Sequence, residues 1–129
     1  MKVVANARLA QSPFPGIRHA TLAGSQQGLT QISLWQQIIE AGGATPPHRH
    51  DCEEVVMCLS GRGALLFNER GVERKVSFGP NNTVCIPRNE LHQLINDGDE
   101  PLHINAVFSR SPVEAFFPDG QPINLPWAS

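Results

Sequence analysis

The sequence contains no tyrosine, only two lysines and three cysteines, and no long apolar run. The ten basic residues are scattered and the net charge is −2, so there is no basic stripe of the kind that binds nucleic acid. No segment is apolar over the length of a membrane span, and the N-terminus lacks a signal-peptide pattern. An odd number of cysteines fits a reducing compartment. We therefore expect a cytoplasmic protein that neither enters a membrane nor binds nucleic acid.

The chain has 129 residues, enough to bury a core without needing a metal or disulfides merely to fold. Eleven prolines and eleven glycines separate short apolar runs, which disfavours long helices. The composition predicts an all-β sandwich or barrel of antiparallel strands. We expect one domain with N-terminal edge strands (1–27), a barrel core (28–110) and a proline-rich tail (111–129).

Alternation of side chains predicts the individual strands. Leu34, Gln36 and Ile38 alternate with the residues between them, which favours a strand and places Trp35 on its opposite face. Weak alternation over residues 1–16 predicts an edge strand that ends in a turn. His19, in the short run that follows, is expected at the surface.

Glycine and asparagine clusters predict where the chain turns. Residues 54–67 are interpreted as a hairpin, two strands joined by the glycine-containing turn 60–63. Residues 74–78 and 83–87 are interpreted as the next pair, connected by the turn 79–82.

Two histidines and an acid stand at metal-ligand spacing in the stretch 42–61. His48 and His50 are two residues apart, and residues i and i+2 of an extended chain project from the same face, roughly 7 Å apart. Two prolines just upstream favour extended backbone there. Glu54 has the same parity and can join the histidines, and His92 opens another strand-like run after a turn. Three imidazoles and one carboxylate together suit a divalent first-row ion.

These residues resemble the two signature motifs of the cupin family. The first motif, G-x5-H-x-H-x3-E-x6-G, is matched in full by Gly42, His48, His50, Glu54 and Gly61. The second, G-x5-P-x-G-x2-H-x3-N, is matched by Pro87, His92 and Asn96, with Asn81 and Asn89 in place of its glycines. Asparagine is the residue after glycine that best tolerates positive φ, so both turns can still form.

The resemblance implies a jelly-roll barrel, an antiparallel double-stranded β-helix, with one divalent metal per chain. Iron, manganese, nickel, copper and zinc all suit three nitrogens and one oxygen, so the ligands do not select among them. The resemblance also implies a homodimer. In the alternative interpretation the four residues are relics, because some cupins keep the barrel and lose the metal; that loss usually removes ligands, and none is missing here.

Four protein ligands around an octahedral ion would leave two positions for a small oxygen-rich molecule, or for that molecule and dioxygen. The leading hypothesis is therefore an oxidoreductase of dioxygenase type. The alternatives are a metal-dependent isomerase, decarboxylase or lyase, and a non-catalytic protein that binds a sugar or an acid. Cupin-type sugar epimerases and the thiol dioxygenases of this superfamily use an active-site tyrosine. The absence of tyrosine therefore argues against both of these activities.

Five further residues are weaker site candidates. Cys58 shares the inward parity of Glu54 and could face the cavity, although a free cysteine is often a small core residue. Arg62 and Arg88 lie on turns from which they could reach a substrate carboxylate. Glu53 and His103 are the candidate proton carriers. His103 enters the cavity only if the polar side of its strand faces inward, and the apolar side is the safer choice for the core.

Overall fold

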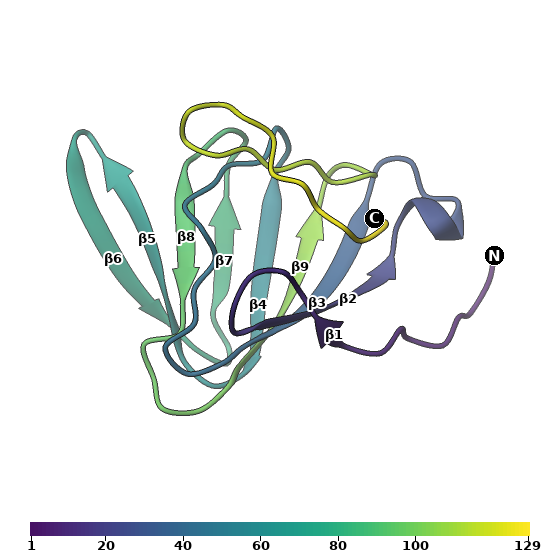
Figure 1. Ribbon diagram of the computed structural model, residues 1–129, viewed down its shortest axis with the longest axis horizontal. Coiled ribbons are helices and arrows are strands. Elements are labelled where there is room, and N and C mark those ends of the chain that lie inside the picture. Colours follow the sequence, from purple (N-terminus) through teal and green to yellow (C-terminus); the bar gives the residue numbers. More distant parts are fainter.

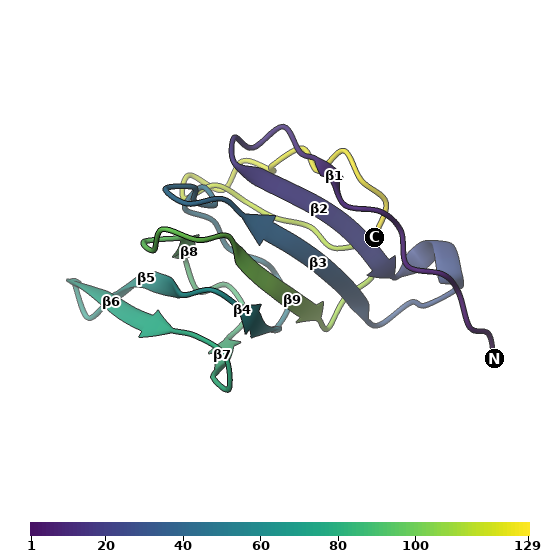
Figure 2. The ribbon, with the colours of Figure 1, turned by 90° about the horizontal axis from the view of Figure 1, so that it is seen from below.

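Nine antiparallel strands form two sheets that face each other in the computed structural model, which describes residues 1–129 (Figures 1 and 2). The strands are β1 (Ala10–Gln11), β2 (Ile17–Ala23), β3 (Ser33–Ile39), β4 (Glu54–Ser60), β5 (Gly63–Glu69), β6 (Val72–Phe78), β7 (Thr83–Ile86), β8 (His92–Ile95) and β9 (Leu102–Phe108). The only helical segment is a 3-10 turn at Ser25–Gln27. It lacks the length and apolar character that crossing a membrane requires.

The larger sheet has the order β1-β2-β3-β9-β4-β7, and the smaller sheet has the order β6-β5-β8. The smaller sheet is widened beyond β8 by segments that are not regular strands. His48 exchanges two backbone hydrogen bonds with His92, and Arg49 exchanges two with Phe116 in the C-terminal tail. The predicted all-β jelly-roll architecture is therefore confirmed, and the tail takes part in it.

The core lies between the two sheets and is built from alternate residues of the strands. Burial alternates along β3, where Trp35 and Ile39 point inward and Ile38 points out. Along β9 the inward residues are apolar, and Leu102 and Phe108 are almost completely buried. The apolar side of β9 thus faces the core, as the safer interpretation of its sequence predicted.

The predicted hairpin over residues 54–67 is wrong, because β4 and β5 belong to different sheets. The same correction holds for the pair 74–78 and 83–87, since β6 and β7 do not bond to each other. The tight hairpin joins β5 to β6 through Arg70 and Gly71, which both have positive φ. A turn signal shows that the chain reverses, but the strands that pair afterwards depend on the rest of the fold.

The turns of the two cupin motifs have the backbone conformation that the sequence predicts. Gly42 and Gly61 have φ values of 80° and 87°, and Asn81 and Asn89, which replace glycines, have φ values of 71° and 65°. At Gly61 a side chain is excluded for a second reason, because a Cβ would collide with the carbonyl oxygen of Pro101.

Two expectations for the N-terminal region need correction. The predicted edge strand over residues 1–16 is reduced to β1, and residues 1–9 are almost entirely exposed. His19 was expected at the surface, but it is only 5% exposed. Its side chain points toward the core from β2 and stacks on Trp127, with ring centroids 3.7 Å apart. The sequence near His19 gives no sign of this contact, because Trp127 lies at the other end of the chain.

Neighbouring isoleucines on β3 provide a test of the core. Ile39→Ala should lower the free energy of unfolding by about 2–5 kcal/mol, since Ile39 is fully buried and truncation leaves a cavity. Ile38→Ala, on the half-buried outer face of the same strand, should cost clearly less. Urea denaturation of both variants measures the difference, and equal losses would contradict the assignment of faces.

Candidate metal centre

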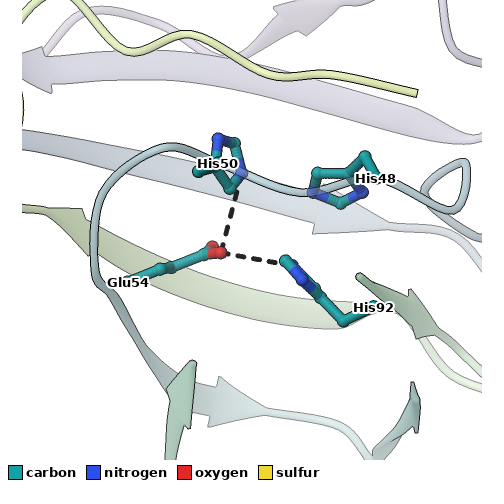
Figure 3. Close-up of side chains that lie close together, drawn as sticks. All are labelled: His48, His50, Glu54 and His92. Atoms are coloured by element: carbon teal, nitrogen blue, oxygen red, sulfur yellow. Dashed lines mark ion pairs between the residues drawn. The ribbon is translucent and has the colours of Figure 1, made fainter. Parts of the chain in front are cut away.

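Four side chains converge between the two sheets, and each offers one ligand atom (Figure 3). These atoms of His48, His50, Glu54 and His92 lie within 4.8 Å of one another, and all four residues are buried. Glu54 Oε1 is 3.3 Å from His92 Nε2 and 3.6 Å from His50 Nε2. The structure therefore brings together all four residues that the sequence motifs predict.

The two sheets contribute different ligands. His48 and His50 lie on the extended segment that runs beside β8, and His92 is the first residue of β8 itself. Because His48 and His92 are paired through their backbones, their rings lie side by side, with centroids 4.4 Å apart. Glu54 begins β4 in the other sheet, after the chain has bent at residues 51–52. The chain between His50 and Glu54 is therefore not one continuous extended strand. The even spacing of Glu54 from the histidines predicted the right residue but is not the reason for its position.

Each imidazole is oriented by a hydrogen bond at the nitrogen that faces away from the cluster. The Nδ1 atoms of His48, His92 and His50 lie 2.6, 2.9 and 2.7 Å from the carbonyl oxygens of Pro46, Glu90 and Glu114, respectively. A carbonyl oxygen only accepts, so each Nδ1 carries the hydrogen and Nε2 is left to act as the ligand. Backbone acceptors of this kind are the usual support of metal-bound histidines.

Burial and mutual charge set the protonation of the cluster. Burial, then the neighbouring His92 and His50, lowers the pKa of His48 to about 3. Burial also lowers the pKa of His50. For Glu54, burial acts to raise the pKa, but the three histidines outweigh it and leave the pKa below its ordinary value. For His92, burial acts to lower the pKa, and the adjacent Glu54 outweighs it and raises it. At neutral pH the cluster thus has a carboxylate and two neutral imidazoles.

The donor set fits a divalent transition metal. Glu54 Oε1 and His92 Nε2 are buried and, apart from each other at 3.3 Å, have no hydrogen-bond partner in the protein. Buried polar atoms without partners are uncommon, because they lose their contacts with water and gain nothing in return. An ion held by the three imidazoles and the carboxylate would satisfy these atoms. The ligands support a divalent ion and do not identify it.

A cavity of about 50 Å³ adjoins the cluster, and its wall is mostly apolar. Besides His48, His50 and Glu54, it is lined by Phe14, Ile17, Trp35, Gln37, Thr45, Pro46, Leu94, Ile104, Ala106, Phe108, Ala115, Ile123, Leu125 and Trp127. None of these other residues carries an ionisable side chain. That space has room for only a few water molecules.

Sequence analysis missed the aromatic part of this wall. The sequence predicts only that Trp35 lies on the strand face opposite to Leu34 and Ile38, and it gives Trp127 no role beyond its place in the proline-rich tail. In the structure their rings are 5.3 Å apart at 87°, and Phe14 packs against Trp127 at 6.2 Å. The indole nitrogens of both tryptophans are buried without a hydrogen-bond partner. Alternation could have indicated the inward face of Trp35, but no local pattern marks Phe14 or Trp127.

The five weaker candidates do not line the cavity. Cys58 is buried, but its thiol contacts the carbonyl oxygen of Ser60, 3.4 Å away. Arg62, Arg88 and Glu53 are exposed. His103 is on the outward side of β9, so the inward orientation that a proton carrier requires is not observed.

The fold and the ligand cluster together define a small cupin with a metal-ligand set of three histidines and one glutamate. A family model described as "Auxin binding protein" matches residues 2–126, and the chain belongs to this family. It is 38% identical over 108 residues to auxin-binding protein 1 of Arabidopsis thaliana, and 36% identical over 111 residues to auxin-binding protein 4 of Zea mays. These alignments cover 79% and 81% of the chain but 54% of each relative, so the chain spans about half their length.

Solved structures with the same fold are more distant in sequence. Oxalate decarboxylase from Bacillus subtilis has a TM-score of 0.75 at 20% identity, covering 88% of this chain and 30% of that one. A recombinant oxalate oxidase in complex with glycolate has a TM-score of 0.74 at 18% identity, covering 85% and 59%. The polyketide cyclase RemF from Streptomyces resistomycificus has a TM-score of 0.72 at 23% identity, covering 97% and 87%. These similarities confirm the cupin fold.

Removing one ligand should remove the metal and leave the fold. His92→Ala and His50→Ala should each abolish stoichiometric metal, because three ligands remain around a site that the protein builds from four. Both variants should give the circular dichroism spectrum of the unmodified protein, since the core is formed without the ion. Elemental analysis after purification without chelator makes the measurement. Full metal content in either variant would contradict the assignment.

His19 should make stability depend on pH. Burial lowers the pKa of His19 to about 4, so the folded protein keeps it neutral. Between pH 6.5 and about 4 the unfolded chain therefore binds a proton at His19 that the folded protein does not, and stability falls as pH is lowered. His19→Phe cannot bind this proton and should lose less stability over the same range. Urea unfolding in EDTA, at several pH values, compares the two; parallel pH profiles would rule out the contribution.

Proposed function

We propose that the protein binds a small apolar carboxylic acid at a metal ion held by His48, His50, Glu54 and His92. The observation that carries this proposal is the composition of the cavity wall, which is apolar and has no ionisable side chain beyond the metal-ligand set. Such a wall favours burial of an apolar body. The carboxylate of the ligand would bind the metal, which supplies a positive charge and Lewis acidity.

The relatives support the same class of ligand. They are named auxin-binding proteins, and auxins are small aromatic carboxylic acids such as indole-3-acetic acid. The aromatic wall formed by Phe14, Trp35 and Trp127 suits a flat ring. The present cavity is smaller than such a molecule, so binding requires part of the wall to move. The C-terminal tail contributes Leu125 and Trp127 to the wall, and both are only half-buried. We therefore expect this side of the wall to move when a ligand binds.

The surroundings of the cluster favour binding over acid–base catalysis. Proton transfer requires an ionisable group within hydrogen-bond reach of the bound molecule. Neither His103 nor Glu53, the two candidates from the sequence, lines the cavity. An oxidoreductase of dioxygenase type depends less on such a group, and it stays a prediction, as does an isomerase, decarboxylase or lyase. Since the cupin fold hosts all of these chemistries, the fold does not choose among them.

A homodimer and a cytoplasmic location also stay predictions. The homodimer is supported by apolar side chains on the outer face of β4, where Val55, Met57 and Leu59 are 39%, 42% and 47% exposed. Contiguous exposed apolar residues on a sheet often mark a contact between proteins. The division into 1–27, 28–110 and 111–129 is likewise a proposal about one domain.

Calorimetric titration of the zinc-loaded protein with indole-3-acetic acid tests the proposed function. We expect saturable binding with no product, and binding weaker by about 10- to 100-fold for indole-3-ethanol, which lacks the carboxylate. His92→Ala, treated with zinc in the same way, should lose the preference for the acid.

Oxygen consumption and product analysis, run on iron- and manganese-loaded protein with the same compounds, separate binding from catalysis. Oxygen uptake with a new product would replace the binding proposal with a dioxygenase. A product without oxygen uptake would point to an isomerase, decarboxylase or lyase. Equal affinity for the acid and the alcohol would contradict a metal–carboxylate contact.

A further inference from the structure

The three histidines of the cluster are not supported in the same way. His48 and His92 are each oriented by a carbonyl oxygen two residues earlier in their own segment. His50 is oriented by the carbonyl oxygen of Glu114, which lies 64 residues away in the C-terminal tail. The direction of the His50 ring therefore depends on how the tail docks against the segment that carries it.

One side chain holds both sides of this contact. The guanidinium of Arg110 donates to Asp51 Oδ2 at 2.5 Å and lies 3.2 Å from Glu114 Oε1. Asp51 is the residue after His50, and Glu114 is the residue whose carbonyl accepts from His50. Arg110 thus links the residue next to His50 with the residue whose carbonyl oxygen accepts the hydrogen bond from His50.

Arg110 is itself fixed at several points. Its Nε donates to the carbonyl oxygen of Pro112 at 3.1 Å, and its own carbonyl oxygen accepts from the hydroxyl of Ser33 at 2.9 Å. A half-exposed ion pair taken alone contributes little to stability. Here the planar guanidinium of Arg110 contacts two carboxylates at once. Without it, the negative charges of Asp51 and Glu114 would face each other across the contact.

Other contacts between the two segments flank this ion pair on both sides. Arg49 and Phe116 exchange two backbone hydrogen bonds, and the guanidinium of Arg49 lies 4.9 Å from the centre of the Phe116 ring. This backbone pairing fixes the distance between the segments at residue 49. On the side nearer to Glu54, the Ser109 N–H donates to the carbonyl oxygen of Glu53 at 3.0 Å and the Glu53 N–H donates to the hydroxyl of Ser109 at 2.9 Å. Between these two anchors, at residue 51, the only ion pair across the gap is that of Arg110.

We propose that Arg110 is a positioning residue, which orients His50 toward the metal by clamping Asp51 and Glu114 together. The inference rests on the proposed metal site and adds to it a dependence on the tail. It distinguishes His50 from the other two imidazoles, which keep their local acceptors whatever the tail does.

The test uses three variants of the full chain. Arg110→Ala removes the clamp, Arg110→Lys keeps the charge without the fork, and Arg74→Ala is the matched control. Arg74 is a half-exposed arginine that pairs with Glu69 across β5 and β6 at 3.8 Å, in the smaller sheet. Dissociation constants for Co²⁺ and Zn²⁺ come from competition with a chromophoric chelator. Imidazole signals of the three histidines are recorded by nitrogen NMR in the metal-free protein.

In Arg110→Ala we expect affinity for both metals to fall by about 10- to 100-fold, the usual cost of losing support behind a ligand. The His50 signals should shift, while those of His48 and His92 stay in place. Arg110→Lys should recover part of the affinity, and Arg74→Ala should behave like the unmodified protein. If Arg110→Ala does not fold, Asp51→Asn removes one half of the clamp and should give the same change at His50 to a smaller degree.

Other results would overturn the inference. Unchanged affinity in Arg110→Ala, or shifts of equal size at all three histidines, would show that Arg110 has no specific role at His50. If the unmodified protein binds neither metal, the proposed function fails, and the His50 signals of the metal-free variants still decide whether Arg110 orients the ring.

Discussion

A carboxylate buried among three imidazoles is the constraint on which the rest of this structure depends. The side chain of Glu54 is only 5% exposed, and a charge so removed from water must be compensated nearby. The compensation comes from the opposite sheet, where His92 lies 3.3 Å from the carboxylate and has its pKa raised by it. Both sheets must therefore close on the same point, and the turns at Gly42 and Gly61 adopt the backbone conformations that bring the segments there. A divalent ion would complete the balance of charge.

The C-terminal tail is part of this centre. Its Glu114 carbonyl supports His50, its backbone pairs with Arg49, and its Trp127 closes the cavity against Trp35. One segment thus contributes both to the support of a metal ligand and to the wall that a bound molecule would meet. A ligand that displaces the tail would act on the support of His50 as well, which links the metal and the cavity physically.

Our proposal of binding rather than catalysis rests on what surrounds the ligands. The ligand set of three histidines and one glutamate is compatible with several chemistries, and the solved structures of this fold include both oxidases and decarboxylases. In this chain the ligands adjoin an apolar wall without further ionisable side chains. Its family relatives are named for binding a small molecule, and this wall agrees with that class of function.

The sequence by itself determined the all-β class, the cupin motifs and the four ligands, because spacing and alternation are local properties that survive in any antiparallel barrel. It also determined that Asn81 and Asn89 could replace glycine in their turns. Only the tertiary structure decided that β4 pairs with β9 rather than β5, that His19 is buried, and that Phe14 and Trp127 line the cavity. These features depend on contacts between segments far apart in the chain, and no local pattern encodes which distant segment will be the partner.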